Sequence, residues 1–273
     1  MTVAYAAGTR AEMRDDSANL LVTLLLVGAS LNGLAVRMAE SWQLHGLDAP
    51  LMGISPFEIL AMVIGAKAIL SSGRPRTSFY PWLELILGAA MLFPSSALAW
   101  FAIAFYGLFA ARETDGERRA GFLLFVALAG CSIWSSVLLK WWAGPASALD
   151  AHTVWRILSW LRNDLAVSGN VVGVPTGHNL IIMTACTSAS LLPKALLGLA
   201  ALNHLAGARF GRRFALAAAL AAMLSVAINI LRLSLMASSG DFYLFVHGPV
   251  GANIFDMGQT LAVVGLSLWA ARR

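Results

Sequence analysis

Apolar stretches of nearly membrane-spanning length recur along this chain, and they limit its fold more than any other feature of the sequence. A helix needs ~20 predominantly apolar residues to cross a bilayer, and such stretches follow one another from the N-terminal region to the C-terminus. Apolar residues make up 59% of the 273 residues and charged residues only 12%, which is far from the balance of a soluble domain. Lipid is therefore the expected solvent for most of the chain.

Eight stretches have this character, and they predict an all-α integral membrane protein, a bundle of about eight transmembrane helices. The expected spans are Ala18 to Met38, Ser55 to Ser72, Phe79 to Phe93, Ser95 to Ala111, Ala120 to Trp142, Thr187 to Ala206, Phe214 to Ala237, and Val250 to Ala271. The third and fourth are short and are separated only by Phe93-Pro94-Ser95, so they form either two short spans or one re-entrant hairpin.

Basic residues lie in every second connection between these spans. They are Arg10 and Arg14 before span one, Arg74 and Arg76 after span two, Arg112, Arg118 and Arg119 after span four, Arg209, Arg212 and Arg213 after span six, and Arg272 and Arg273 at the end. Cytoplasmic loops of membrane proteins carry an excess of lysine and arginine. We therefore expect a multi-pass protein of a bacterial inner (plasma) membrane with both termini in the cytoplasm. The net charge of +5 is thus spread over loops, which predicts contact with membrane lipid and not with nucleic acid.

The chain is expected to form a single polytopic domain, because no internal repeat or low-complexity linker divides it. Residues 1–142 hold five spans, residues 143–182 form an outer loop, and residues 183–273 hold spans six to eight. No small-x-small cleavage site follows span one, which is therefore expected to stay as an uncleaved anchor. Cys131 in mid-span five and Cys186 at the outer start of span six differ in depth, so no disulfide is expected between them.

The outer connection from Ala143 to Ile182 has enough polar sequence to build more than a turn. Its segment Val154 to Arg162 places aromatic and aliphatic groups at helical spacing with two arginines, which predicts a helix in the headgroup layer. The segment Gly169 to Ile182 has two short β-branched runs around Pro175-Thr176-Gly177, which predicts a small hairpin. This hairpin would deliver Cys186 to the membrane surface.

Topology brings three polar residues to that same outer level. Arg232 follows the start of span seven by eighteen residues, or ~27 Å at the helical rise, which places it near the outer boundary. Asn229 lies three residues earlier on the same helical face, and His247 follows in the next outer loop. Cys186, Arg232 and His247 are therefore expected to converge.

A thiol, a guanidinium and an imidazole together can perform acyl transfer. A thiol attacks only as the thiolate, which a nearby cation favours, and a histidine can remove its proton and later protonate a leaving amine. Arginine stays charged and suits stabilisation of the thiolate or of an oxyanion. No metal and no cofactor is expected in such a site.

Each of these residues also has a structural interpretation. An arginine near the end of a span often reaches lipid phosphates, and a loop histidine or a helix-start cysteine is often structural. His178 in the hairpin is a rival base or a locally hydrogen-bonded turn residue, and Asp256 either orients His247 or pairs elsewhere. Three further charged residues lie within spans, namely Glu58, Glu84 and Lys67. Their side chains either extend from the span ends to the membrane–water interface or form ion pairs inside the bundle.

In the C-terminal half the sequence resembles the exosortase/archaeosortase family of integral membrane cysteine transpeptidase-like enzymes. The resemblance lies in the order and spacing of four elements, namely Gly169-Asn170, Ala185-Cys186, Asn229 to Arg232, and His247. Thr184 stands where the family usually has glutamate, and Thr187-Ser188 replaces its Ser-Gly. The first four spans add little to the resemblance.

The resemblance implies Cys186 as nucleophile, His247 as acid/base and Arg232 as electrostatic stabiliser. From the residues themselves, Asn229, His178 and Asp256 are the candidates for supporting roles. The resemblance also implies a membrane cysteine peptidase or transpeptidase that cleaves a C-terminal sorting signal of exported, membrane-anchored proteins through a thioester on Cys186, on the periplasmic face. The alternative is a non-catalytic scaffold or transporter component for export of protein or polysaccharide, in which Arg232 binds an anionic group. A transporter should carry polar residues along a midplane path, whereas here they gather on one face.

Overall fold

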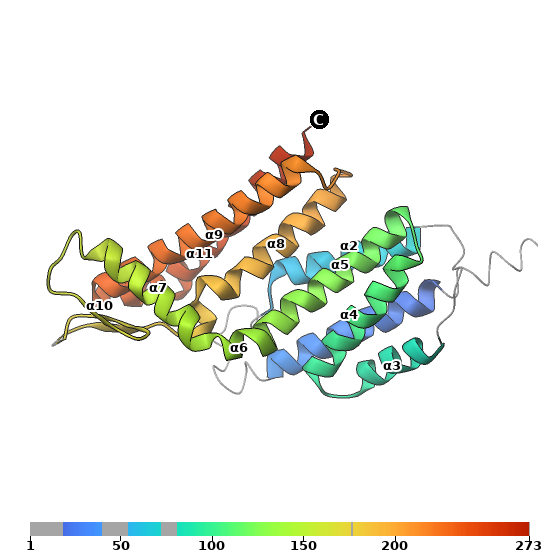
Figure 1. Ribbon diagram of the computed structural model, residues 1–273, viewed down its shortest axis with the longest axis horizontal. Helices are drawn as coiled ribbons and strands as arrows, with labels where there is room; N and C mark the ends of the chain where they lie inside the picture. The colour runs from blue at the N-terminus through green and yellow to red at the C-terminus, as the bar shows by residue number, and fades with distance from the viewer. Residues whose placement is uncertain (1–18, 40–53, 72–80, 176, 273) are drawn as a thin grey trace, which may run out of the picture. The chain divides into compact units, whose positions relative to one another are not determined.

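The computed structural model describes residues 19–39, 54–71, 81–175 and 177–272, and the chain packs as two compact units, Met1–Ile133 and Trp134–Arg273 (Figure 1). About 81% of the described residues are helical and their sheet has only three short strands, so the prediction of an all-α fold is confirmed. Among the expected cytoplasmic arginines, Arg10, Arg14, Arg74, Arg76 and Arg273 lie outside the described residues.

The first unit contains five helices in its described part. They are Asn19–Ala39, α2 Pro56–Ser71, α3 Pro81–Leu92, α4 Ser96–Arg112 and α5 Gly116–Ile133. Helices α2 and α4 both pack on α5, and α3 packs on α4. Glycines let α2 and α5 approach closely, since a Cβ added to Gly121 would lie 2.7 Å from the carbonyl oxygen of Gly65.

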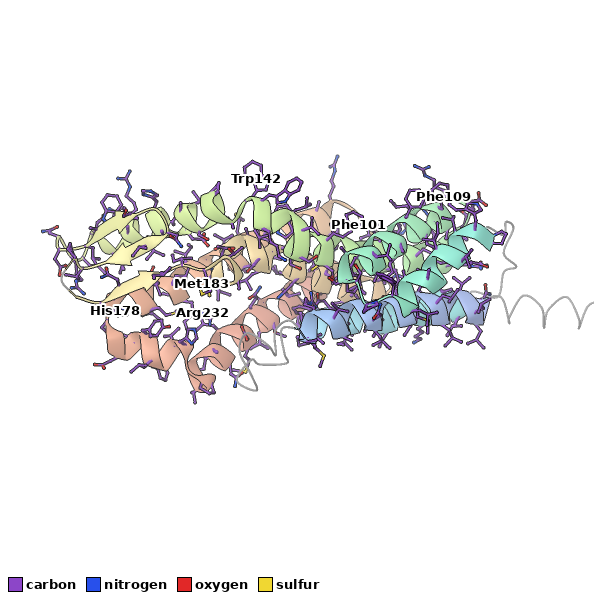
Figure 2. All side chains as sticks on the ribbon, turned by 90° about the horizontal axis from the view of Figure 1, so that it is seen from below. Phe101, Phe109, Trp142, His178, Met183 and Arg232 are labelled. Carbon is purple, nitrogen blue, oxygen red and sulfur yellow. The ribbon has the colours of Figure 1, made fainter. Side chains whose placement is uncertain are left out.

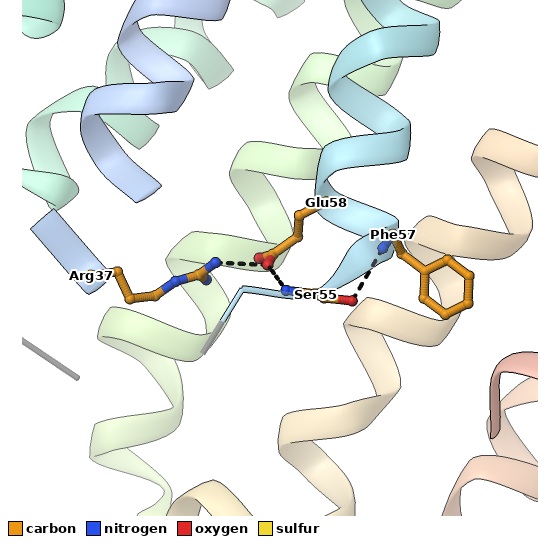
Figure 3. A network of polar contacts seen from close by, with 4 residues as sticks. All are labelled: Arg37, Ser55, Phe57 and Glu58. Carbon is orange, nitrogen blue, oxygen red and sulfur yellow. Dashed lines mark hydrogen bonds and ion pairs between the residues drawn. The ribbon is translucent and has the colours of Figure 1, made fainter. Parts of the chain in front are cut away.

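A buried ion pair joins two helices of this unit. Glu58 is 0% exposed, and its Oε2 accepts hydrogen bonds of 2.7 Å from Arg37 Nη2 and from the backbone N–H of Ser55 (Figure 3). A buried carboxylate is tolerated when it is paired in this way. Of the two interpretations of Glu58, the internal pair is therefore the one found.

The second unit begins with a π-helical turn, η3 Trp134–Leu138, and a short helix, α6 Leu139–Trp141. Then follow α7 Ala143–Leu158, β1 Ala166–Ser168, β2 Val171–Gly173, β3 Asn179–Ile181, the 3₁₀ turn η4 Thr184–Cys186, α8 Ser188–Leu205, α9 Arg212–Ser238, α10 Gly240–His247 and α11 Pro249–Ala271. Helices α8, α9 and α11 pack on one another, and α7 and α10 also pack on α9 (Figure 1).

Each of the eight expected spans coincides with a helical segment, with ends that differ by a few residues. In the part of the chain that the structure describes, four segments are long and apolar enough to cross a membrane, namely Asn19–Ala39, Gly116–Trp141, Arg212–Ser238 and Pro249–Ala271. Helices α3 and α4 are shorter, with 12 and 17 residues.

The helix in the outer connection lies earlier in the chain than the sequence indicated. Helix α7 covers Ala143–Leu158, so the predicted segment Val154 to Arg162 is helical only in its first half. Tertiary hydrogen bonds stabilise the turn that follows: the Trp155 indole donates to the Leu165 carbonyl at 3.1 Å, and Arg162 donates to the Ser238 carbonyl at 2.8 Å. Periodicity alone could not reveal these partners.

The predicted hairpin is present as β2 and β3, and β1 adds a third antiparallel strand in the order β1-β2-β3. Gly169 begins the turn between β1 and β2 with a φ of 58°, which glycine adopts without a steric penalty. Asn170 then holds the end of the hairpin, because its side chain donates to the Ile182 carbonyl at 3.0 Å and its own carbonyl accepts from the Ile182 N–H at 2.9 Å.

One face of the sheet packs on α7 and α9. The buried side chains there include Val154, Leu158, Val172, Leu180, Ile182, Leu233, Met236 and Val246. Because this core joins the sheet to α9, it fixes the segment that enters η4 relative to the helix that carries Arg232.

Candidate active site

Cys186 lies at the end of the tight turn η4, immediately before α8. Its N–H donates to the Met183 carbonyl at 2.9 Å, and Thr187 closes the turn by donating from its hydroxyl to the Thr184 carbonyl at 2.8 Å. Thr187 is also the N-cap residue of α8 and is fully buried. The Cys186 side chain is partly buried against the core of the second unit and is not in a disulfide.

Asn229 of α9 anchors the backbone on both sides of this turn. Its buried Nδ2 donates to the Cys186 carbonyl at 3.0 Å and to the Ser188 hydroxyl at 3.1 Å. The amide is thus a positioning group for the cysteine, since it holds the Cys186 carbonyl and the Ser188 side chain and does not contact the sulfur.

Asp150 of α7 completes this anchor, and sequence reasoning missed it. Its Oδ2 accepts the N–H of Ser188, the first residue of α8, at 2.6 Å. A carboxylate suits a helix N-terminus, where backbone N–H groups lack helical partners. Burial raises the pKa of Asp150, and the hydrogen bonds from Ser188 oppose that shift.

Arg232 provides positive charge near the sulfur. Burial raises the pKa of the Cys186 thiol above its ordinary value, and the Arg232 charge acts in the opposite direction. Within the described chain, Nε of Arg232 is buried without a hydrogen-bond partner. A buried donor without a partner is costly, so this N–H is available to a bound acceptor such as a carbonyl oxygen.

Two histidines lie on either side of a tyrosine in the same unit. His178 Nε2 lies 2.9 Å from the Met236 carbonyl oxygen, which can only accept, so the neutral ring carries its proton on Nε2 and a lone pair on Nδ1. The His178 ring centroid lies 5.7 Å from that of Tyr243, which in turn stacks on His247 at 5.2 Å. Figure 2 labels His178 and Arg232.

The structure therefore brings the predicted residues together in two groups. Asn229 is hydrogen-bonded to the Cys186 carbonyl and the Arg232 charge acts on the Cys186 thiol, whereas His178 and His247 both lie against Tyr243. Among the described residues, neither imidazole is hydrogen-bonded to the thiol.

Asp256 lies apart from both groups. It is exposed on α11, where its backbone carbonyl accepts from the Thr260 hydroxyl at 2.8 Å, and its carboxylate is not hydrogen-bonded to His247 in the described part of the chain. In the same described residues, no three His, Cys, Asp or Glu side chains are grouped so that they could hold a metal ion.

Comparisons of the chain with protein-family models, with curated proteins and with solved structures gave no match.

Proposed function

We propose that this chain is an exosortase-like membrane cysteine transpeptidase or endopeptidase that cleaves a C-terminal sorting signal of exported, membrane-anchored proteins. The observation that carries the proposal is a cysteine held at a helix start beside a guanidinium whose buried Nε–H has no partner among the described residues. A nearby cation and an available donor are the two features that a thiolate nucleophile and its oxyanion require.

The proposal includes a membrane topology. Four helices are long and apolar enough to span, and the other four expected spans complete eight crossings. The alternating basic loops then leave both termini in the cytoplasm and the site at the periplasmic face of a bacterial inner membrane.

In the proposed reaction, His247 removes the proton from Sγ of Cys186, and the thiolate attacks the carbonyl carbon of the scissile peptide bond. A C–S bond forms while the carbonyl π electrons move to oxygen, where Arg232 stabilises the negative charge. The carbonyl then re-forms, the C–N bond breaks, and the leaving amine takes the proton from His247. Water or an amine finally attacks the thioester and releases the Cys186 thiol.

His178 is the second candidate for the base, because its geometry is well defined. Its Nε2–H is fixed on the Met236 carbonyl, so Nδ1 is the free basic atom. A base oriented by a third group is the common arrangement in nucleophilic catalysis. Separate His178→Gln and His247→Gln variants distinguish the two, since loss of the true base abolishes acyl-enzyme formation.

The test replaces the nucleophile in the native host. Both Cys186→Ala and Cys186→Ser should abolish cleavage of anchored precursors, whereas Cys131→Ser, which changes the second of the two cysteines, should not. A mass spectrum of the trapped enzyme should show the acyl group on Cys186 and identify the attached peptide. Precursor cleavage at the wild-type rate in Cys186→Ala would disprove the proposal.

A further inference from the structure

Strand β3 has a free edge that leads directly to Cys186. Among the residues that the structure describes, the sheet order β1-β2-β3 leaves β3 with β2 as its single neighbouring strand. The Val174 N–H donates to the His178 carbonyl at 3.1 Å, and the Ile182 N–H donates to the Asn170 carbonyl at 2.9 Å. Both bonds join residues that are opposite each other in the register of β2 and β3.

These two bonds determine which backbone groups of β3 face away from β2. Hydrogen-bonded and non-hydrogen-bonded pairs alternate along an antiparallel ladder, so Leu180 bonds to Val172 while Asn179 and Ile181 point their N–H and C=O outward. Met183 continues the strand with extended backbone at φ −81° and ψ 156°, so its N–H lies on the same outer side, whereas its C=O accepts the Cys186 N–H at 2.9 Å. Within the described residues, the Asn179, Ile181 and Met183 N–H groups have no backbone partner on this outer side.

Two of these residues, Ile181 and Met183, expose apolar side chains on the face opposite the core. Leu180 and Ile182 are buried in the core, whereas Ile181 and Met183 are each 62% exposed. Met183 is three residues before Cys186 and is labelled with Arg232 in Figure 2. Within the described residues, a strip of outward N–H groups without backbone partners, bordered by the apolar side chains of Ile181 and Met183, therefore ends three residues before Cys186.

We propose that this edge binds an extended peptide as a fourth strand, antiparallel to β3, and so leads its backbone to Cys186. The occupant is a peptide because the free groups alternate at the spacing of a strand and match the donors and acceptors of an extended chain. Its residues opposite Ile181 and Met183 should be apolar, because cross-strand neighbours share a face. That this peptide is the substrate rests on the proposed function.

The test uses the full-length protein in nanodiscs and fluorescent decapeptides of alternating valine and threonine. One peptide is unmodified, one carries N-methyl groups on the valine amides, and one carries them on the threonine amides. Valines beside Ile181 and Met183 point their N–H groups at β3, so methylation of the valines should weaken binding about tenfold or more, while methylation of the threonines changes it little. Equal effects of the two methylations, or no binding of the unmodified peptide, would overturn the proposal.

A pair of variants tests the enzyme side of the same contact. Met183→Pro removes one outward N–H at a φ that proline accepts, and Met183→Leu keeps that N–H and an apolar side chain. Met183→Pro should weaken the unmodified peptide about threefold to tenfold, while Met183→Leu binds like wild type. The alkylation rate of Cys186 by iodoacetamide should be the same in both, which shows that the site is intact. Equal affinities of the two variants for the peptide would contradict the inference.

The two proposals fail separately. If Cys186→Ala still cleaves precursors while valine methylation still abolishes binding, the edge is a peptide site on a protein without the proposed chemistry. If Cys186→Ala abolishes cleavage while the two methylated peptides bind equally, the enzyme proposal stands and the edge proposal is wrong.

Discussion

The Cys186 thiol is subject to two opposing influences. Burial raises its pKa, and this effect is larger than the opposing effect of the Arg232 charge. The thiol is therefore mainly protonated at neutral pH, and its reactivity depends on a base and on the nearby cation.

Arg232→Gln removes the cation and should raise the pKa of Cys186 further. The thiolate fraction at a fixed pH then falls, so the pH-rate profile of iodoacetamide alkylation should shift to higher pH. Arg232→Lys keeps the charge and should shift the profile less. An unshifted profile in Arg232→Gln would show that the guanidinium does not act on the sulfur.

Some residues of the site could be predicted from sequence and others could not. Asn229 and Arg232 share a helical face by spacing alone, and α9 presents both to the cysteine segment. Asp150 is a single carboxylate in an apolar stretch, and its role depends on the approach of α7 to the start of α8. No local pattern encodes that approach.

At the scale of elements, α7 is attached to the N-terminus of α8 through Asp150 and Ser188. A raised pKa means that the folded protein binds the Asp150 proton more tightly than the unfolded chain does. Protonated Asp150 therefore contributes to the free energy of unfolding at low pH. This contribution is lost as the pH rises through the raised pKa, because the carboxyl group must then ionise while it is buried.

Asp150→Asn keeps an acceptor for the Ser188 N–H without the buried charge. The Tm of this variant at pH 7.5 should equal or exceed that of wild type, and the difference should vanish toward pH 4. Asp150→Ala leaves the buried N–H unpaired and should cost about 1–3 kcal/mol at both pH values. Thermal unfolding of the purified protein in detergent measures both effects. A lower Tm for Asp150→Asn at pH 7.5 would show that the carboxylate charge is stabilising.

The helices were largely predictable because each needs only a long apolar run, which lies within one segment of sequence. The hairpin of β2 and β3 was predictable from its turn residues. Strand β1 was not, because Ala166-Val167-Ser168 is too short to show alternation and forms a strand through its pairing with β2. The displaced α7 likewise reflects the tertiary contacts of Trp155 and Arg162.

At the scale of the whole molecule, the proposed topology places Cys186 outside the cytoplasm. A membrane-impermeant maleimide added to intact spheroplasts should therefore label the Cys131→Ser variant, whose remaining cysteine is Cys186. The Cys186→Ser variant should stay unlabelled, because Cys131 is buried. Labelling of Cys131→Ser only after permeabilisation would place the site on the cytoplasmic side and reject the topology.

The fixed register between β2 and β3 has a consequence for how such a chain can vary in length. Asn170 fixes Ile182, and a Cβ on Gly173 would lie 2.6 Å from Cα of Asn179, so neither strand has room to slip. Adding or deleting one residue between Leu180 and Ile182 would leave one of these two side chains pointing away from the core. Length changes during divergence should therefore spare the segment from Leu180 to Ile182.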